Sequence, residues 1–130
     1  MAQYRLFRGD TGKSALEPLD LLASPFENGP GEFKGVGGVV LGNASRVMLM
    51  RFESGSHPGF HRAIPAFAVL LEGALVVTAG DGAEVTLAPG DAIRVEPMER
   101  GTWRLGNPGL TDALFAVVPM PPVSSAASQG

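Results

Sequence analysis

Short apolar stretches separated by turn residues recur from about residue 35 to residue 118. Glycine, proline, asparagine and aspartate supply the turns, as in Gly-Asp-Gly at 80–82 and Pro-Gly-Asp at 89–91. Short strands at roughly ten-residue spacing are typical of an all-β sandwich or barrel. No stretch has the long 3.6-residue period of a capped helix, so helices are expected to be minor. The predicted strands cover residues 35–41, 46–53, 67–71, 74–78, 84–87, 92–95, 102–105 and 114–118.

The two ends of the chain differ from this pattern. Residues 1–32 are mixed, and within them 16–22 could form one helical turn or an edge strand before the prolines and glycines that follow. The last ten residues are mostly Pro, Ser and Ala, a composition that favours disorder. A length of 130 residues suits one domain. We therefore expect an N-terminal arm over 1–32 that packs on a barrel over 33–120, and a flexible tail over 121–130.

The predicted strand at 46–53 has two different faces. Arg46, Met48, Met50 and Phe52 alternate with Val47, Leu49, Arg51 and Glu53, and alternate residues of a strand point to opposite sides of its sheet. One of these two sets should line a core or a cavity. Arg51 and Glu53 lie on the same side and can pair with each other, as a surface ion pair or as a pair that orients a ligand.

Composition and charge exclude several classes of function. The net charge is −3 and no basic run is present, so the chain lacks the electrostatic signature of a nucleic-acid-binding protein. It has no cysteine, which excludes disulfides, thiolate metal sites and a cysteine nucleophile. The N-terminus has no apolar signal-peptide core, and the near-apolar run at 63–71 is too short for a membrane span. We expect a cytoplasmic protein with neither nucleic-acid nor membrane partners.

The segment 55–106 resembles the cupin superfamily. A histidine-bearing stretch is followed by Leu-Leu-Glu-Gly at 70–73, Ala-Pro-Gly-Asp at 88–91, a proline-containing turn and an aromatic residue. The two four-residue phrases are the most specific features, and one glycine-rich turn separates them. The resemblance extends over about residues 33–120. It implies a jelly-roll β-barrel with a pocket inside its mouth, commonly in a homodimer.

The resemblance also indicates that the usual metal site of the family is largely lost. Metal-binding cupins carry two histidines as His-x-His, then a carboxylate or amide, and a last histidine after the proline-rich turn. Aligned from Gly55 or from Gly73, only His61 falls on a histidine position. The last-histidine position falls near Gly101 or Thr102, and no histidine follows residue 61. The standard set of three histidines and one acid therefore cannot be built.

Two histidines, His57 and His61, remain as candidate polar groups. If the segment between them is extended, both imidazoles can face the barrel interior. Together with a carboxylate or waters they would form a non-standard site for a divalent transition metal. Without a metal, His61 could act as an acid, a base or a ligand donor. A third alternative is structural, with one histidine exposed on a loop and the other hydrogen-bonded in the wall. The candidate carboxylates are Glu53, Glu72 and Glu99.

Aromatic and thioether side chains are the candidates for an apolar ligand wall. Trp103 follows the proline-containing turn and could stack on a ligand or fill the core or a dimer interface. Met50, Phe60 and Phe67 could form a soft apolar cavity, or serve ordinary core packing. Arg62 would point outward from a regular strand, but on an irregular one it would be the nearest anion anchor.

The hypothesis from sequence is a cupin-fold protein that binds a small, largely apolar or weakly anionic metabolite inside its barrel. His57, His61, Trp103 and the Phe and Met side chains would contact the ligand, and no cofactor would be required. The alternative is a metal-dependent lyase, isomerase or oxygenase that uses His57 and His61. A third candidate is a structural or regulatory dimer whose own side chains fill the barrel.

Overall fold

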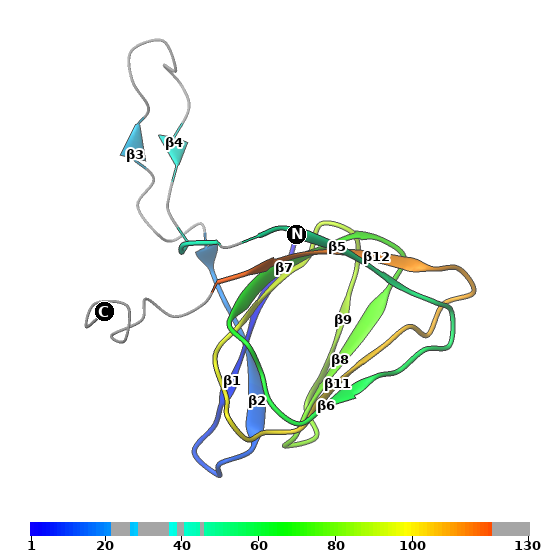
Figure 1. Ribbon diagram of the computed structural model, residues 1–130, viewed down its shortest axis with the longest axis horizontal. Helices are drawn as coiled ribbons and strands as arrows, with labels where there is room; N and C mark the ends of the chain where they lie inside the picture. The colour runs from blue at the N-terminus through cyan, green and yellow to red at the C-terminus, as the bar shows by residue number, and fades with distance from the viewer. Residues whose placement is uncertain (22–26, 29–36, 39–40, 45, 121–130) are drawn as a thin grey trace.

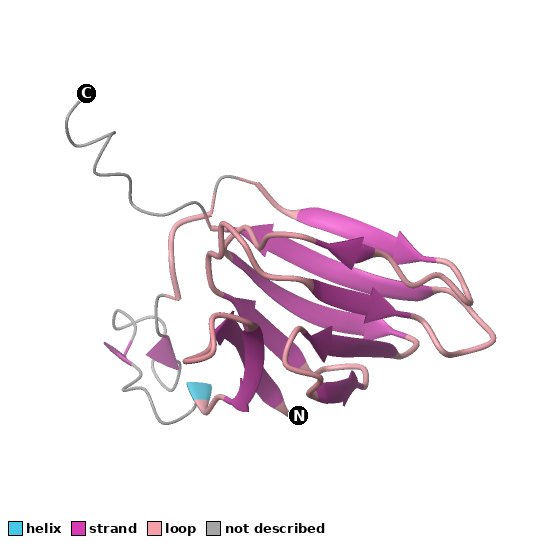
Figure 2. Cartoon of the chain, turned by 90° about the horizontal axis from the view of Figure 1, so that it is seen from below, coloured by secondary structure: helices cyan, strands magenta, loops and turns pink. Residues whose placement is uncertain are grey.

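The structure of the protein is a computed structural model, which describes residues 1–21, 27–28, 37–38, 41–44 and 46–120. The described residues form an all-β fold in which a six-stranded sheet faces a four-stranded sheet (Figures 1 and 2). The strand order in the larger sheet is β2-β1-β10-β7-β12-β5, and in the smaller one it is β6-β11-β8-β9. The predicted all-β jelly-roll class is confirmed.

The strand bounds match the pattern of apolar stretches closely. From residue 46 to residue 119, every predicted strand is formed with bounds shifted by two residues or fewer. The predicted strand at 35–41 lies mostly outside the described residues. The larger sheet contains β1 (Gln3–Arg8), β2 (Ser14–Pro18), β5 (Met48–Phe52), β7 (Ala66–Glu72), β10 (Ala92–Val95) and β12 (Ala113–Pro119). The smaller sheet contains β6 (Gly59–Phe60), β8 (Leu75–Ala79), β9 (Glu84–Leu87) and β11 (Trp103–Gly106), and a separate pair is formed by β3 (Glu27–Asn28) and β4 (Gly37–Gly38).

The core lies between the two sheets. Leu6, Leu70 and Phe115 from the larger sheet belong to the same buried cluster as Leu75 and Val77 from the smaller one. Side chains of this kind contribute about 1.5–3 kcal/mol each when fully buried. Strand alternation explains the cluster, because β7 buries Ala66, Ala68 and Leu70 in turn. No helix among the described residues has the length and apolar character needed to cross a membrane.

The first eighteen residues contribute two strands to the larger sheet. β1 pairs in parallel with β10, with Leu6 opposite Val95, and antiparallel with β2. The edge-strand alternative for 16–22 therefore holds as far as Pro18. The apolar-polar pattern of β1 is weak because Arg5 lies on the outer face beside Phe7, 4.1 Å from that ring. The predicted boundary at residue 32 and the tail 121–130 lie outside the described residues.

Asp91, the last residue of the Ala-Pro-Gly-Asp phrase, connects its turn to the start of the chain. One carboxylate oxygen accepts a hydrogen bond from the Ala2 N–H at 2.7 Å, and the other accepts one from the Ala88 N–H at 2.8 Å. Hydrogen bonds to the ionised form lower the pKa of a carboxyl group, and here the Ala2 and then the Ala88 N–H lower the pKa of Asp91. The motif therefore holds β1 against β10.

A second carboxyl group is stabilised on the outer face of the larger sheet. Glu96 accepts hydrogen bonds from the Arg5 guanidinium, which also pairs with Glu17. The hydrogen bond from Arg5 is the main cause of a lowered pKa for Glu96, and it outweighs the opposing effect of partial burial. The same contacts raise the pKa of Arg5.

These two carboxyl groups predict a loss of stability in acid. Their lowered pKa values mean that the native state keeps them ionised where the unfolded chain already binds protons. Their contribution is complete above the ordinary carboxyl pKa of about 4 and is lost as the pH falls through the lower native values. Urea unfolding measured between about pH 6 and pH 3 should show this decline. In the Asp91→Asn and Glu96→Gln variants the decline should be shallower; an unchanged slope would contradict the assignment.

Candidate functional site

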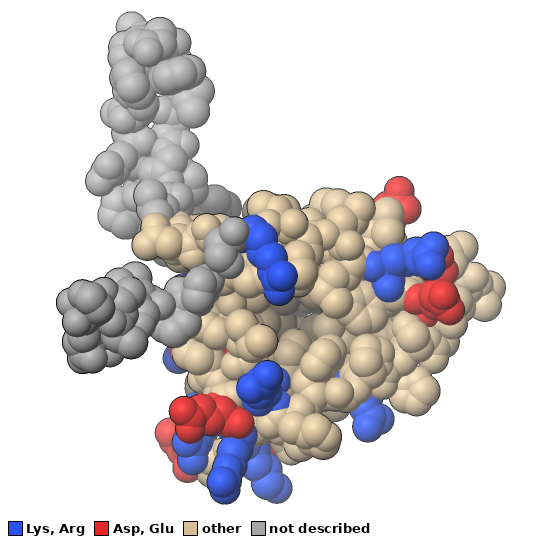
Figure 3. Space-filling view, viewed as in Figure 1, with Lys and Arg blue, Asp and Glu red and all other residues tan. Residues whose placement is uncertain are grey.

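A cavity of about 550 Å³ opens between the two sheets. Its lining is mostly apolar and comes from β5, β7, β10 and β12 of the larger sheet and from β6 and β11 of the smaller one. Figure 3 shows the surface hollowed near the centre of this face, with basic side chains on opposite sides of the hollow. The volume lies within the range of sites for small molecules. The barrel is therefore not filled by its own side chains at this end.

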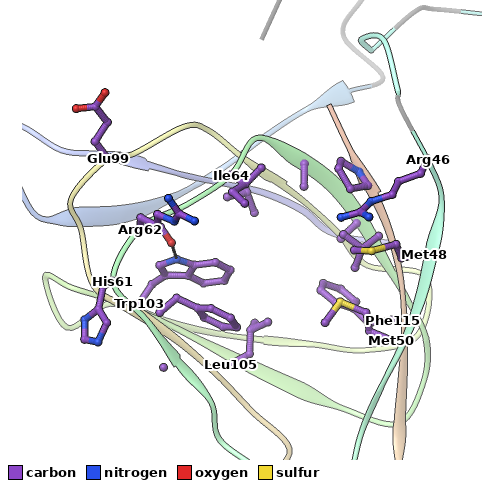
Figure 4. A pocket seen from close by; sticks show the side chains of 17 residues that line it. Arg46, Met48, Met50, His61, Arg62, Ile64, Glu99, Trp103, Leu105 and Phe115 are labelled. Atoms are coloured by element: carbon purple, nitrogen blue, oxygen red, sulfur yellow. Dashed lines mark hydrogen bonds between the residues drawn. The ribbon is translucent and has the colours of Figure 1, made fainter. Parts of the chain in front are cut away.

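Two stacked aromatic rings form one wall of the cavity. Phe60 on β6 pairs with Trp103 on β11, and their ring centroids are 4.5 Å apart with an interplanar angle of 26°. The indole N–H of Trp103 donates a hydrogen bond to the Arg62 carbonyl at 2.9 Å (Figure 4). This bond satisfies the polar atom of the ring. The wall therefore offers a ligand an apolar aromatic surface in a fixed orientation.

Thioether and aromatic side chains form the opposite wall. Met48 and Met50 on β5 line the cavity together with Phe115 on β12, whereas Val47 and Leu49 are 74% and 63% exposed on the other side. One alternate set of residues 46–53 thus faces a cavity, as the pattern predicts. Flexible thioethers can adapt to ligands of different shape.

The Arg51–Glu53 pair lies away from this cavity. The guanidinium of Arg51 is 3.9 Å from the Glu53 carboxylate and 3.7 Å from that of Asp112, and all three side chains are well exposed. Exposed pairs of this kind contribute little to stability. The geometry is that of a surface ion pair.

The two histidines do not come together in the cavity. His57 is exposed, its Nδ1 lies 3.1 Å from the Gly55 carbonyl oxygen, and it is not part of the lining. His61 borders the cavity but is exposed, and Figure 4 shows its ring on the outer side of the loop, away from Trp103. The segment is not a continuous strand, because only Gly59 and Phe60 are extended and paired. The condition for two inward-facing imidazoles is therefore not met.

The donor groups of this region do not fit a metal ion. Nowhere in the described part of the chain do three His, Cys, Asp or Glu side chains come close enough together to hold one. A protein site for a catalytic zinc needs three such ligands. Glu99 borders the cavity, but Figure 4 shows its carboxylate directed away from it. The metal ligand set that the fold family implies is thus not provided by the described residues.

Among the other residues predicted to contact a ligand, Met50, Phe60 and Trp103 line the cavity and Phe67 does not. Phe67 follows Ala66 on β7, and Ala66 faces the cavity. Successive side chains of a strand point to opposite faces, so Phe67 lies on the outer face, where it is opposite Arg94.

Two arginines lie at the cavity, and the structure was needed to place both of them. Arg46 precedes β5 on the same side as Met48, and Arg62 lies in an irregular segment after β6. Ala63 forms an isolated bridge with Met98, with hydrogen bonds of 2.9 and 3.0 Å, and it is buried while its neighbour Arg62 is exposed. The irregular-strand alternative for Arg62 is therefore the one that occurs. For Arg46, the sequence signal was the strand alternation over 46–53, which places its side chain on the same face as Met48.

Comparisons with known proteins identify the family. Residues 45–108 match the EutQ-like cupin domain. A structure from Salmonella typhimurium, named as an ethanolamine utilization protein Q, aligns with 93% of this chain and 96% of its own, at 16% identity and a TM-score of 0.50. A Rhizobium leguminosarum protein of unknown function aligns with 58% of this chain and 68% of its own, at 28% identity and a TM-score of 0.50.

A third similar structure is named as a sugar phosphate isomerase from a cupin superfamily of Silicibacter pomeroyi. It shares 28% identity over 57% of this chain and 48% of its own, with a TM-score of 0.48. This chain thus spans about half the length of that protein. A comparison with curated proteins found no match. The match to the cupin domain and the two facing sheets lead to one conclusion: this chain contains a small cupin domain.

Proposed function

We propose that this cupin binds a small, largely apolar molecule in the cavity between its two sheets and requires no metal to do so. The observation that carries this proposal is the lining. An aromatic wall at Phe60 and Trp103 faces a thioether wall at Met48 and Met50 across about 550 Å³. Burial of apolar ligand surface between such walls is favourable.

The polar atom of the aromatic wall is compatible with an apolar ligand. The Trp103 N–H already has a backbone partner, so the aromatic wall makes no demand for a polar group at that point. Ala66 and Ala68 on β7 contribute only methyl groups to the lining. An apolar ligand would thus leave no hydrogen-bonding group of the Trp103 ring or of these alanines unsatisfied.

Trp103 gives a direct measurement, because it is the single tryptophan of the chain and it lines the cavity. Titration with 3-phenylpropanamide, an uncharged aromatic probe, should change its fluorescence emission in a saturable way. The same probe should raise the melting temperature, since a ligand at 100 times its dissociation constant adds about 2.7 kcal/mol of stability. If neither this probe nor its carboxylate changes the emission or the melting temperature, the proposal is wrong.

The alternative, a metal-dependent enzyme using His57 and His61, makes a different prediction. Protein purified without chelator or histidine tag would contain close to one equivalent of a transition metal, and a His57→Ala/His61→Ala variant would lose it. We expect instead a substoichiometric metal content that is the same in both proteins, measured by plasma mass spectrometry. A stoichiometric metal lost with the two histidines would favour the enzyme.

The homodimer implied by the resemblance stays a prediction. The outer face of the larger sheet exposes Leu49 on β5 and Leu71 on β7 at 63% and 50%, and a second copy would cover such apolar area. Light scattering at micromolar concentration would decide, and a monomer would remove the expectation.

A further inference from the structure

Two guanidinium groups without an ion-pair partner among the described residues lie at the mouth of the apolar cavity. Arg46 and Arg62 both line it and both are exposed. Figure 4 shows them on opposite sides of one end of the cavity, with their guanidinium groups turned toward it. Five ion pairs are present in the described part of the chain, and none of them includes either arginine. Glu99 also borders the cavity but lies beyond ion-pair distance of both.

We infer that the ligand of this cavity is an amphipathic anion: a small apolar body that ends in one anionic group, held at the mouth by Arg46 and Arg62. This inference rests on the proposed function and specifies the chemical class of its ligand. An ionised group inside the apolar part of the cavity would pay a large desolvation penalty. At the mouth the same group stays partly hydrated and meets two donors suited to carboxylate geometry.

The backbone around Arg62 is held in place. Its carbonyl oxygen accepts the Trp103 N–H, and the next residue, Ala63, is bridged to Met98 by two backbone hydrogen bonds. The aromatic wall and this arginine are therefore coupled through one peptide group. A ligand ring that packs on Trp103 would place an attached anionic group beside Arg62.

Arg46 approaches from the other wall. It precedes β5 on the side that carries Met48, and both residues line the cavity. The thioether wall thus also ends in a cation. Because Arg46 precedes a strand of the larger sheet and Arg62 follows a strand of the smaller one, one anionic group between them would be bound at both walls. The rest of the ligand would then point into the apolar interior.

The test compares three probes of the same shape by the emission of Trp103: 3-phenylpropanoate, 3-phenylpropanamide and 3-phenylpropylamine. We expect the carboxylate to bind about tenfold more tightly than the amide, and the amine to bind most weakly. Added salt should weaken the carboxylate and leave the amide unchanged, because exposed charges are screened.

Variants assign the preference to the two arginines. In Arg46→Gln/Arg62→Gln the preference should be lost, so that this variant binds the carboxylate only as well as it binds the amide. Arg46→Lys/Arg62→Lys should keep part of the preference. Arg8→Gln removes the same charge from β1, outside the cavity lining, and should keep all of it.

The outcomes separate this inference from the proposed function. Equal binding of carboxylate and amide, or a preference that survives in the double glutamine variant, would overturn the anionic ligand and leave the apolar site standing. Absence of binding by all three probes would overturn the proposed function itself.

Discussion

Gly73→Ala is expected to lower the free energy of unfolding by about 3 kcal/mol, the combined effect of backbone strain and a steric clash. Gly73 has a φ of +82°, a conformation that residues with a Cβ rarely adopt. A Cβ at this position would lie 2.9 Å from the Ala113 Cα and 3.0 Å from the Asp112 carbonyl oxygen. Both are backbone atoms at the start of β12, so the clash cannot be relieved by a side-chain rotation.

Gly82→Ala is the matched control for the clash. Its φ is +93°, but no atom lies within 4 Å of the added Cβ. This variant should therefore lose only the conformational contribution, about 1–2 kcal/mol. Urea unfolding followed by Trp103 fluorescence measures both losses. Similar losses in the two variants would mean that the β7–β8 turn does not approach β12 as closely as the structure shows.

Ala66→Phe is expected to weaken binding of 3-phenylpropanamide by more than tenfold, or about 1.4 kcal/mol. Ala66 lies on β7 and lines the cavity, and its strand neighbours across the sheet are Val95 and Pro119. A benzyl group in place of the methyl group would occupy the space between the two walls. The effect should be on affinity, measured by the emission of Trp103, with the fold retained in the circular dichroism spectrum.

The control places the same group on the other side of the sheet. Ala116 lies on β12 between Phe115 and Val117, which both line the cavity, so its own side chain points to the outer face. Ala116→Phe should leave the probe affinity within about twofold of the parent, which is under half a kcal/mol. Loss of binding in both variants would indicate a general disturbance of the larger sheet and would contradict the location of the site.

All strands between residues 46 and 119 except the two-residue β6 were predicted, because their signal is local. Alternating apolar residues and turn glycines specify a strand whatever its partner is. β1 was missed because Arg5 and Phe7 share its outer face, where Arg5 is partnered by Glu96, the residue that follows β10. That partner is distant in the sequence, so no local pattern could reveal why a charged residue is acceptable there.

Some of the residues that line the cavity were predictable from the sequence, and others were not. Alternation placed Met48 and Met50 on one face of their strand, and the family resemblance placed Trp103 near a barrel mouth; all three line the cavity. His57 and Phe67 were expected to contact a ligand but lie outside the lining. Alternation alone cannot tell which face of β7 turns inward at Phe67, because both of its faces carry apolar residues.

The amino-acid pattern alone was enough to specify the class of fold, the positions of most strands along the chain and the absence of any histidine after residue 61. These properties depend on which residues are present and on their local periodicity. Tertiary structure was needed to show that the chain bends after Phe60, which separates the two histidines, and that Arg46 and Arg62 meet across an apolar cavity. The physical reason is that strand pairing and the packing of the two sheets bring together residues far apart in the chain. Local periodicity carries no information about such contacts.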